Sequence, residues 1–242
     1  MNPVDRHRRD EALRAANRTR RRPGQWLRLG GRRLTDWLAV GPLALLLFLT
    51  VRTFAVEAFR IPSSSMERTL LVGDFLLVNK WVYGAEIPFT GRRLPAARIP
   101  RHNDVIVFDW PVDPDKAFVK RLVGLPGDTL AMQAGVLQRN GRIVPEPYLR
   151  GVGPDSDSAN GAASGALNVR NSWGPLVVPA RHYFVLGDNR GNSLDSRYWG
   201  FVPDSLLRGE PWVVYYSFTP DSTRAVPWLT RIRWQRIGTT VR

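Results

Sequence analysis

The stretch AFVKRLVGLPGD, residues 117–128, decides the fold class that we predict for most of this 242-residue chain. Its apolar run ends at a Pro-Gly-Asp turn signal, which is typical of a buried strand. The same pattern recurs between Gly, Pro and Asn or Asp clusters in FLLVNKWVYG (75–84), DVIVFDWP (104–111), HYFVLGDN (182–189) and EPWVVYYSF (210–218). No long segment of residues 57–242 has a helical period. We therefore predict a mostly β domain, built as a coiled antiparallel sheet or a partly closed β-barrel.

Two stretches between these strands have their own signatures. In GVLQRNGRIV, residues 135–144, the pair Asn140-Gly141 predicts a hairpin with a type I′ turn. Residues 151–175 are rich in Gly, Ser, Ala and Asp and offer little to bury. We expect this segment to be a mobile surface insertion.

Upstream of the β-rich part lies the one long apolar run, WLAVGPLALLLFLTV, residues 37–51. Continued to Val56 it gives twenty residues, interrupted by Arg52. About twenty apolar residues span a bilayer, and an arginine near one end can extend to the interface. The alternatives are a cleaved signal peptide, for which TFAVEAF offers no clear A-x-A site, and a buried core helix. We predict a single transmembrane anchor at residues 37–56.

The charge distribution indicates how this anchor is oriented. The chain has a formal charge of +14, and residues 1–36 hold eleven Arg against four acidic residues, a net of +7. A basic arm directly before an apolar run more often reflects membrane topology than nucleic-acid binding. We therefore expect a cytoplasmic arm at residues 1–36, an extracytoplasmic domain at residues 57–242 in the cell (inner) membrane, and no nucleic-acid partner.

Composition also limits the chemistry. Cysteine is absent, which excludes disulfides, a thiol nucleophile and a Cys-based metal site. The three histidines, His7, His102 and His182, are scattered, so no metal or cofactor site is expected. Only Lys80, Lys116 and Lys120 are lysines, while arginine supplies nearly all other positive charge.

The stretch RIPSSSMERTLLVGD, residues 60–74, places three serines just after the predicted anchor. Three serines in a row are most often a loop. A catalytic serine needs a base, usually histidine. His7 falls on the wrong side of the predicted membrane, and His102 and His182 remain candidates, although each suits a surface or strand-edge position better.

Lys120 is the other candidate base. Strand alternation places Phe118, Lys120 and Leu122 on one face, so Lys120 has apolar neighbours. Burial disfavours an ammonium and lowers its pKa, and a base at neutral pH needs a fall of roughly three units from about 10.4. The alternative is that Lys120 faces solvent and Arg121 is the buried, paired residue. Alternation does not decide between them.

A third polar stretch, GDNRGNSLDSRYWGFV, lies at residues 187–202. It crowds amides, hydroxyls and charges between two apolar segments, which suggests a turn network with internally satisfied hydrogen bonds. Alone, it would be interpreted as an ordinary polar loop.

Together these stretches resemble the bacterial type I signal peptidases, also called leader peptidases. The matching motifs are RIPSSSMERTLLVGDFLLVNKWVYG, DVIVFDWP, FVKRLVGLPGD, FVLGDNRGNSLDSRYWGFV and the tail IRWQRIG, in the family's order. The resemblance covers roughly residues 52–238, with residues 151–175 unmatched. It implies a mostly β catalytic domain, in agreement with the strand pattern.

The resemblance also implies site residues. The nucleophile is the serine directly before the methionine, Ser65, and the general base is Lys120. The hydroxyl of Ser63, with the N–H of Ser65, would form the oxyanion hole. Ser193 would hydrogen-bond and orient the lysine.

Asp195 and Arg197 match an ion pair that supports the family's site. Arg68 stands where the family's S-M-x-P-T-L motif has proline, which puts the stiffness of that loop in doubt.

The implied function is a membrane-anchored serine endopeptidase that cleaves signal peptides from exported precursors after small residues. Its partners would be these precursors and membrane lipid. Trp228 and Trp234 suit an interfacial contact, or else pack inside the β domain.

Two other function classes compete with this one. The first is a catalytically silent, anchored β-domain that binds peptides or envelope proteins, which would not need a serine and lysine pair. The second is a basic nucleic-acid binder, which the charge distribution disfavours. Self-cleaving repressors share the Ser/Lys pair but lack an anchor.

Overall fold

The computed structural model describes residues 40–50, 52, 55–87, 90, 92–149, 171–221, 223 and 226–241. The chain divides into two compact units, Met1–Thr50 and Val51–Arg242. In the first unit, residues 40–50 are helical, with exposed leucine side chains. No helix in these described ranges combines the length and hydropathy needed to cross a membrane. The expected arm at residues 1–36 and the first anchor residues, 37–39, lie outside the described residues.

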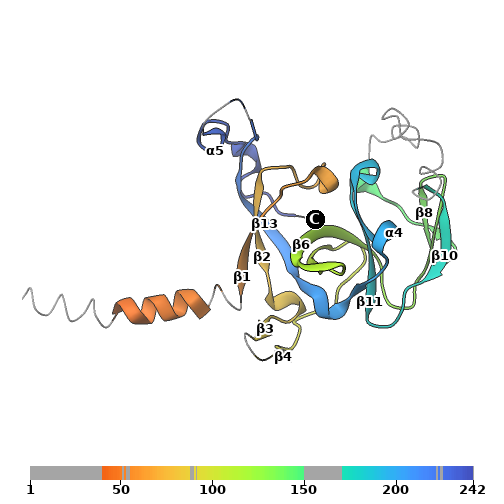
Figure 1. Cartoon of the computed structure of the whole chain (residues 1–242), viewed down its shortest axis with the longest axis horizontal. Helices are drawn as coiled ribbons and strands as arrows, with labels where there is room; N and C mark the ends of the chain where they lie inside the picture. The colour runs from red at the N-terminus through yellow and green to blue at the C-terminus, as the bar shows by residue number, and fades with distance from the viewer. Residues whose placement is uncertain are drawn as a thin grey trace, which may run out of the picture. The chain divides into compact units, whose positions relative to one another are not determined.

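The second unit is built on a seven-stranded sheet in which every neighbouring pair is antiparallel (Figure 1). Its order is β1 (Val56–Arg60), β2 (Asp74–Asn79), β13 (Leu207–Ser217), β5 (Val105–Trp110), β6 (Asp113–Gly124), β11 (His182–Leu186) and β12 (Val202–Pro203). The order does not close on itself. The mostly β, antiparallel prediction is therefore confirmed, and the described strands form no closed barrel.

A four-stranded accessory sheet lies beside β11, on the side away from β13 (Figure 1). Its order is β10 (Trp173–Val177), β7 (Thr129–Gln133), β8 (Val136–Arg139) and β9 (Arg142–Ile143). A two-stranded ribbon joins β3 (Glu86–Ile87) and β4 (Arg92–Arg93). The remaining elements are short helices: η1 (Ser64–Met66), η2 (Trp81–Tyr83), η3 (Pro147–Leu149), η5 (Arg190–Asn192), α4 (Ser196–Trp199), η6 (Asp204–Leu206), α5 (Pro227–Thr230) and η7 (Trp234–Arg236).

Each of the five predicted strand stretches contains a strand, with boundaries that shift for local reasons. FLLVNKWVYG ends its strand at Asn79, because the Asn79 side chain accepts a hydrogen bond from the Trp81 N–H (3.0 Å) and the chain turns into η2. The predicted type I′ turn is confirmed, since Asn140 and Gly141 have φ of 53° and 74° between β8 and β9.

Two predicted boundaries are wrong. Val56, the expected last residue of the anchor, begins β1 and pairs with Asn79 of β2. The expected mobile insertion also ends too late, because its last three residues belong to β10. Trp173 packs on Phe184 with a ring separation of 5.1 Å, so this end of the segment has apolar surface to bury. Residues 150–170 lie outside the described residues.

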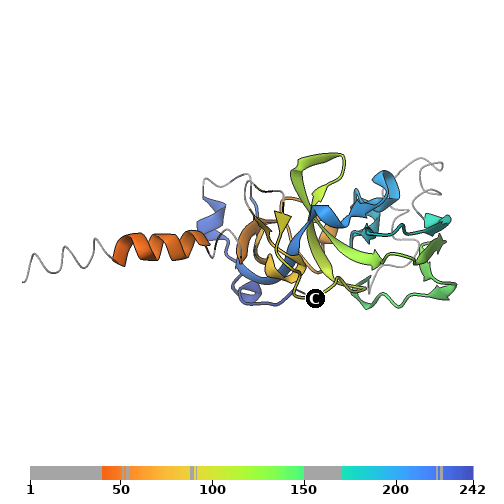
Figure 2. The ribbon, with the colours of Figure 1, turned by 90° about the horizontal axis from the view of Figure 1, so that it is seen from below.

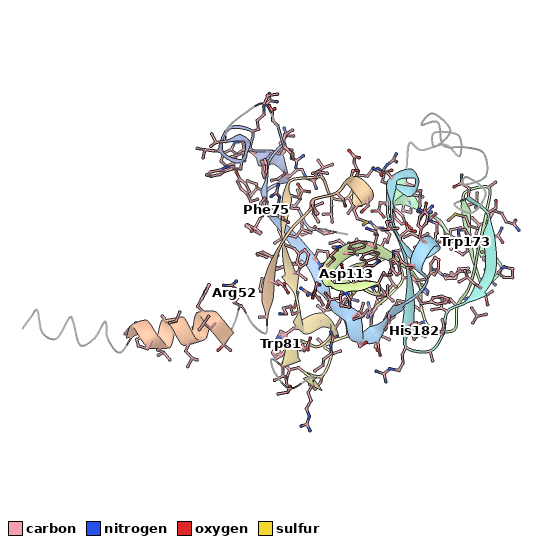
Figure 3. All side chains as sticks on the ribbon, viewed as in Figure 1. Arg52, Phe75, Trp81, Asp113, Trp173 and His182 are labelled. Carbon is pink, nitrogen blue, oxygen red and sulfur yellow. The ribbon has the colours of Figure 1, made fainter. Side chains whose placement is uncertain are left out.

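Three apolar clusters form the core of this unit. One lies under the loop at residues 61–70 and β2, around Met66 and Leu76, and a second lies between β5, β6 and β11 around Phe108. The third joins the accessory sheet to β11 around Phe184. Figure 3 shows Phe75 and Trp173, which flank the first and third of these regions, toward opposite sides of the unit. The turn between β5 and β6 projects away from this core (Figure 2), with Val112 65% exposed.

Candidate active site

Strand β6 buries both of its faces near its C-terminal end. Lys120 is 3% exposed and Arg121 is 2% exposed, so neither side chain faces solvent. The reason is that β6 is an inner strand, hydrogen-bonded to β5 on one side and to β11 on the other, with packed material on both faces. Alternation along the strand still separates the two side chains into different surroundings.

On one face, Lys120 meets the loop that carries the three serines. Its Nζ donates a hydrogen bond to Ser65 Oγ (2.8 Å) and another to the Val119 carbonyl (3.1 Å). Ser65 is also buried and lies in η1, directly before the buried Met66. Burial lowers the pKa of Lys120 to about 8, against the opposing charges of Asp195 and Asp188. The pair therefore combines a hydroxyl with an amine whose pKa lies much closer to neutral pH than that of a free lysine.

The Ser63 hydroxyl lies on the same side, with its Oγ 3.3 Å from Ser65 Oγ. Both hydroxyls and Lys120 line a cavity of about 330 Å³. Its other walls are largely apolar and include Ile61, Met66 and Phe118. A cavity of this kind can hold a short, small side chain or an extended segment of peptide beside the serine.

The backbone around Ser65 is held by the polar stretch at residues 187–202. Asn189 donates from its backbone N–H to the Ser65 carbonyl (3.0 Å) and from its side chain to the Ser64 carbonyl (3.2 Å). Asn192 donates to Ser64 Oγ (2.8 Å). The sequence placed both asparagines in a polar loop without giving them these roles. Their crowding in one short stretch is the only local signal for such a clamp.

Gly187 is required at the start of this clamp. A Cβ at that position would lie 2.2 Å from Ser193 Oγ and 2.6 Å from the Ser65 carbonyl oxygen. Any side chain would therefore separate the two loops.

Ser193 lies buried next to this glycine, but its hydroxyl makes no hydrogen bond with good geometry to any described residue. The expected bond to Lys120 is thus not among the described contacts. The hydroxyl is close enough to Asp195 to help lower the pKa of that carboxyl. Burial opposes this shift, and the dominant lowering interaction is with Arg197.

Asp195 and Arg197 form a buried ion pair, with Arg197 Nε 2.8 Å from Asp195 Oδ1. Asp195 also accepts a bond from the Gly187 N–H (3.0 Å), and Arg197 donates to the Arg190 carbonyl (2.8 Å). This pair fixes the loop that contains Ser193 from both ends. The sequence resemblance had matched it to a supporting role.

On the other face of β6, Arg121 enters a second polar network. It donates to both Asp188 oxygens, each at 2.8 Å, and to the Thr69 hydroxyl at 3.1 Å. The Tyr148 ring lies 4.0 Å from the Arg121 guanidinium carbon. Sequence reasoning proposed pairing for Arg121 only as an alternative to burial of Lys120, and it missed Tyr148.

Arg68, at the position of the family's proline, has φ of 103°. Proline is restricted to φ near −65°, so this loop has a shape that proline cannot adopt. The Arg68 guanidinium donates to the Leu149 carbonyl (2.9 Å) and so attaches the loop to η3.

The other candidate bases lie elsewhere. His102 Nε2 contacts Asp128 Oδ2 (2.7 Å), and His182 Nδ1 contacts the Ala180 carbonyl (2.9 Å). Lys80 lies 3.6 Å from Glu57, and the exposed Lys116 pairs with Asp113 (2.8 Å). His7 lies outside the described residues. In the described part of the chain, no group of three His, Cys, Asp or Glu side chains is arranged to hold a metal ion.

The two C-terminal tryptophans are exposed, Trp228 by 54% and Trp234 by 72%. The alternative that they pack inside the β domain is therefore wrong.

Comparison with known proteins adds the family context. The family model described as signal peptidase, peptidase S26, matches residues 34–216. A signal peptidase I from Pseudomonas fluorescens is 38% identical over 212 residues, which are 78% of this chain and 74% of the relative. A probable signal peptidase I-2 from Synechocystis is 36% identical over 222 residues, covering 87% of this chain and 85% of the relative.

Among solved structures, a signal peptidase I from Enterococcus faecalis is 33% identical and covers 46% of this chain and 96% of its own. Its TM-score is 0.36. The family assignment therefore rests on the sequence matches.

Proposed function

The chain belongs to the signal peptidase family, peptidase S26, and from this premise we propose that it is a membrane-anchored serine endopeptidase that works with a Ser65/Lys120 pair. Signal peptidase activity follows from the family match and from the relatives that carry that name. The finer parts of the proposal are the catalytic residues, the anchor and the preference for small residues before the cleaved bond.

One observation supports the mechanism above all others: Lys120 Nζ lies 2.8 Å from Ser65 Oγ in a buried setting that lowers the pKa of the lysine to about 8. A neutral Lys120 amine accepts the Ser65 proton across this contact as Oγ attacks the carbonyl carbon of the scissile bond. The resulting ammonium then gives its proton to the departing amine nitrogen, which leaves an ester on Ser65. Water, deprotonated by Lys120, hydrolyses this ester and restores the free serine.

Charge on the attacked carbonyl oxygen needs a donor. We assign this role to the Ser63 hydroxyl together with the Ser65 backbone N–H, because Ser63 Oγ lies 3.3 Å from Ser65 Oγ on the cavity side. Loss of one such donor typically costs about 10²–10³ in rate. The cleavage rate of the Ser63→Ala variant should therefore be lower than that of the wild type by this factor. Full activity in this variant would contradict the assignment.

The apolar cavity fits the proposed substrate. Walls formed by Ile61, Met66 and Phe118 favour apolar, uncharged side chains. Signal peptides carry small residues at their cleavage sites. The partners are then signal-peptide-bearing precursors and membrane lipid, with no metal or cofactor used by this mechanism.

Anchoring by the apolar run that begins at residue 37 and ends before β1, with residues 1–36 cytoplasmic and the β domain outside, would fix the enzyme where its substrate emerges. Tethering both to one membrane raises the effective concentration of the precursor. The exposed Trp228 and Trp234 suit contact with the interface. Protease added to spheroplasts should degrade the β domain, and protection of that domain would exclude this orientation.

The decisive test is incubation of the purified protein in detergent with a precursor that carries an A-x-A site. Wild-type protein should release the mature chain, and Ser65→Ala should not. The N-terminus of the product identifies the cleaved bond. A folded Ser65→Ala protein that cleaves at the wild-type rate would refute the Ser/Lys mechanism.

A further inference from the structure

A short segment that directly follows β9 of the accessory sheet contacts all three parts of the chain that carry the proposed catalytic groups. It consists of Glu146 and the helix η3, Pro147–Leu149, and we call residues 146–149 the brace. The brace follows β9 and the buried Val144, which belongs to the cluster that joins the accessory sheet to β11. It therefore extends from a packed base toward the site.

The first contact is a buried ion pair between Glu146 and Arg190. Arg190 Nη1 donates to Glu146 Oε2 at 3.1 Å, and Nη2 donates to Oε1. The two side chains are 8% and 10% exposed. A two-point contact of this kind fixes the direction of the guanidinium as well as its position.

Arg190 passes this constraint to the nucleophile. Its Nε donates to the Gly187 carbonyl (3.2 Å), and its own carbonyl accepts from Arg197 (2.8 Å). Between Gly187 and Arg190 lies Asn189, whose backbone N–H bonds to the Ser65 carbonyl (3.0 Å). The Glu146 carboxylate thus orients the loop that clamps the Ser65 backbone.

The second and third contacts reach the other two catalytic segments. Tyr148 donates from its hydroxyl to Glu146 Oε1 (2.6 Å), and its ring lies 4.0 Å from the guanidinium carbon of Arg121, the neighbour of Lys120. The Leu149 carbonyl accepts a bond from Arg68 (2.9 Å), on the loop just after Ser65. The four residues of the brace thereby contact the loop after Ser65, the strand β6 that carries Lys120, and the polar stretch at residues 187–202.

We propose that Glu146 is a positioning residue for peptide cleavage. It sets the relative placement of Ser65 and Lys120 through Arg190, while Tyr148 holds the Lys120 strand against the same carboxylate. Exposed ion pairs contribute little, but a buried two-point pair constrains geometry strongly. Geometry matters because a displacement of about 1 Å far from the reacting atoms can cost about 10² in rate. The inference rests on the Ser65/Lys120 mechanism proposed above.

The test is Glu146→Gln in the full-length enzyme. Glutamine keeps the size and one acceptor oxygen, but it cannot accept from both Arg190 nitrogens and Tyr148. We expect kcat for precursor cleavage, per folded molecule, to fall about 10–100-fold. KM should stay within about threefold, because the cavity walls at Ile61 and Met66 are untouched. Near-ultraviolet circular dichroism gives the folded fraction.

Glu210→Gln is the matched control. It removes a carboxylate from another glutamate–arginine pair, with Arg98 (2.6 Å), which also donates to Asp104 and lies outside the catalytic loops. Its kcat should remain within about twofold of wild type. A folded Glu146→Gln with wild-type kcat overturns the proposal. An equal loss in both variants also overturns it, since the effect would then be general.

A second variant covers the case in which Glu146→Gln does not fold. Tyr148→Phe keeps the ring on Arg121 and removes only the hydroxyl bond to Glu146. We expect a loss in kcat of about 3–10-fold with KM unchanged, the size of one hydrogen bond. Wild-type kcat in folded Tyr148→Phe would refute the brace. Failure of the underlying mechanism looks different, because Ser65→Ala would then be active whatever the brace variants do.

Discussion

Lys120 and Arg121 are neighbours on β6, both almost fully buried, yet they meet opposite surroundings. Arg121 donates to the Asp188 carboxylate, the Thr69 hydroxyl and the Asn103 carbonyl. Lys120 has only the Ser65 hydroxyl and the Val119 carbonyl as hydrogen-bond partners among the described residues, with no carboxylate in contact. The same strand thus buries one cation with a counter-ion and one without.

The difference separates support from chemistry. A buried charge with a well-placed counter-ion keeps its charge and fixes the groups around it. A buried amine without one is driven toward its neutral form, which is the form a general base needs. The cavity lies on the Lys120 side of the strand. The hydrogen bonds that join Arg121 to Asp188 and Thr69 lie on the other side.

The strongest way to break this comparison is to exchange lysine for arginine at position 120. Arginine keeps the charge and much of the length, but it does not lose its proton at usable pH because its pKa exceeds about 12. If Lys120 is the base, Lys120→Arg should lose at least about 10³ in rate while remaining folded. The double variant with Ser65→Ala should be no worse than the more damaging single change, because the two residues act as one unit.

Lys116→Arg is the control for this exchange. Lys116 lies on the same strand, is 64% exposed and pairs with Asp113, so the same substitution there should leave the rate unchanged. Cleavage of a precursor by each variant gives the rates, and circular dichroism gives the folding. A folded Lys120→Arg enzyme within tenfold of wild type would end the Ser/Lys mechanism.

The reverse exchange, Arg121→Lys, tests the other half of the comparison. One ammonium cannot reproduce the fork that reaches both Asp188 oxygens and Thr69. We expect the free energy of unfolding to fall by about 2 kcal/mol, from hydrogen bonds lost to buried, charged partners. Urea unfolding measures this change. Arg181→Lys, at an arginine 80% exposed, should change stability by less than about 0.5 kcal/mol. Equal stability of the two variants would show that the Arg121 network is not structural support.

The sequence predicted the five inner strands of the seven-stranded sheet because their signal is local. Apolar runs bounded by Gly, Pro and Asn located these five strands, and the pair Asn140-Gly141 predicted the turn between β8 and β9. A second turn of the same kind, at Ala134-Gly135 with φ of 48° and 80°, was missed because alanine rarely adopts positive φ. Strand alternation could not show which of Lys120 and Arg121 is buried. It assumes that one face of the strand is solvated, and both faces of β6 are buried at these residues.

The site was predictable only where a motif names its residues. Strand alternation made Lys120 a candidate base, and the resemblance selected it and supplied Ser63, Ser65, Ser193, Asp195 and Arg197. The roles of all six remain proposals. The contacts of Glu146 with Arg190, and of Tyr148 with Arg121, join residues that no local period relates. Such pairs depend on how the accessory sheet and β6 come together, and a single sequence does not contain that information in its local patterns.

The smallest expected effect concerns the pH dependence of the rate. With the pKa of Lys120 at about 8, the wild-type rate should rise with pH through a midpoint near that value, because only the deprotonated amine accepts the Ser65 proton.

The carboxylates of Asp195 and Asp188 oppose the effect of burial and raise this pKa. Asp188→Asn removes one of these negative charges. This change favours the neutral amine, so the midpoint should move to lower pH, and the variant should keep relatively more of its rate under mildly acidic conditions. Asp113→Asn, an exposed carboxylate on the same strand, is the control and should leave the midpoint in place. The measurement is kcat/KM for precursor cleavage across the pH range in which all three proteins stay folded. A midpoint that moves upward in Asp188→Asn, or does not move relative to Asp113→Asn, would mean that the group titrating in the rate is not Lys120 beside Asp188.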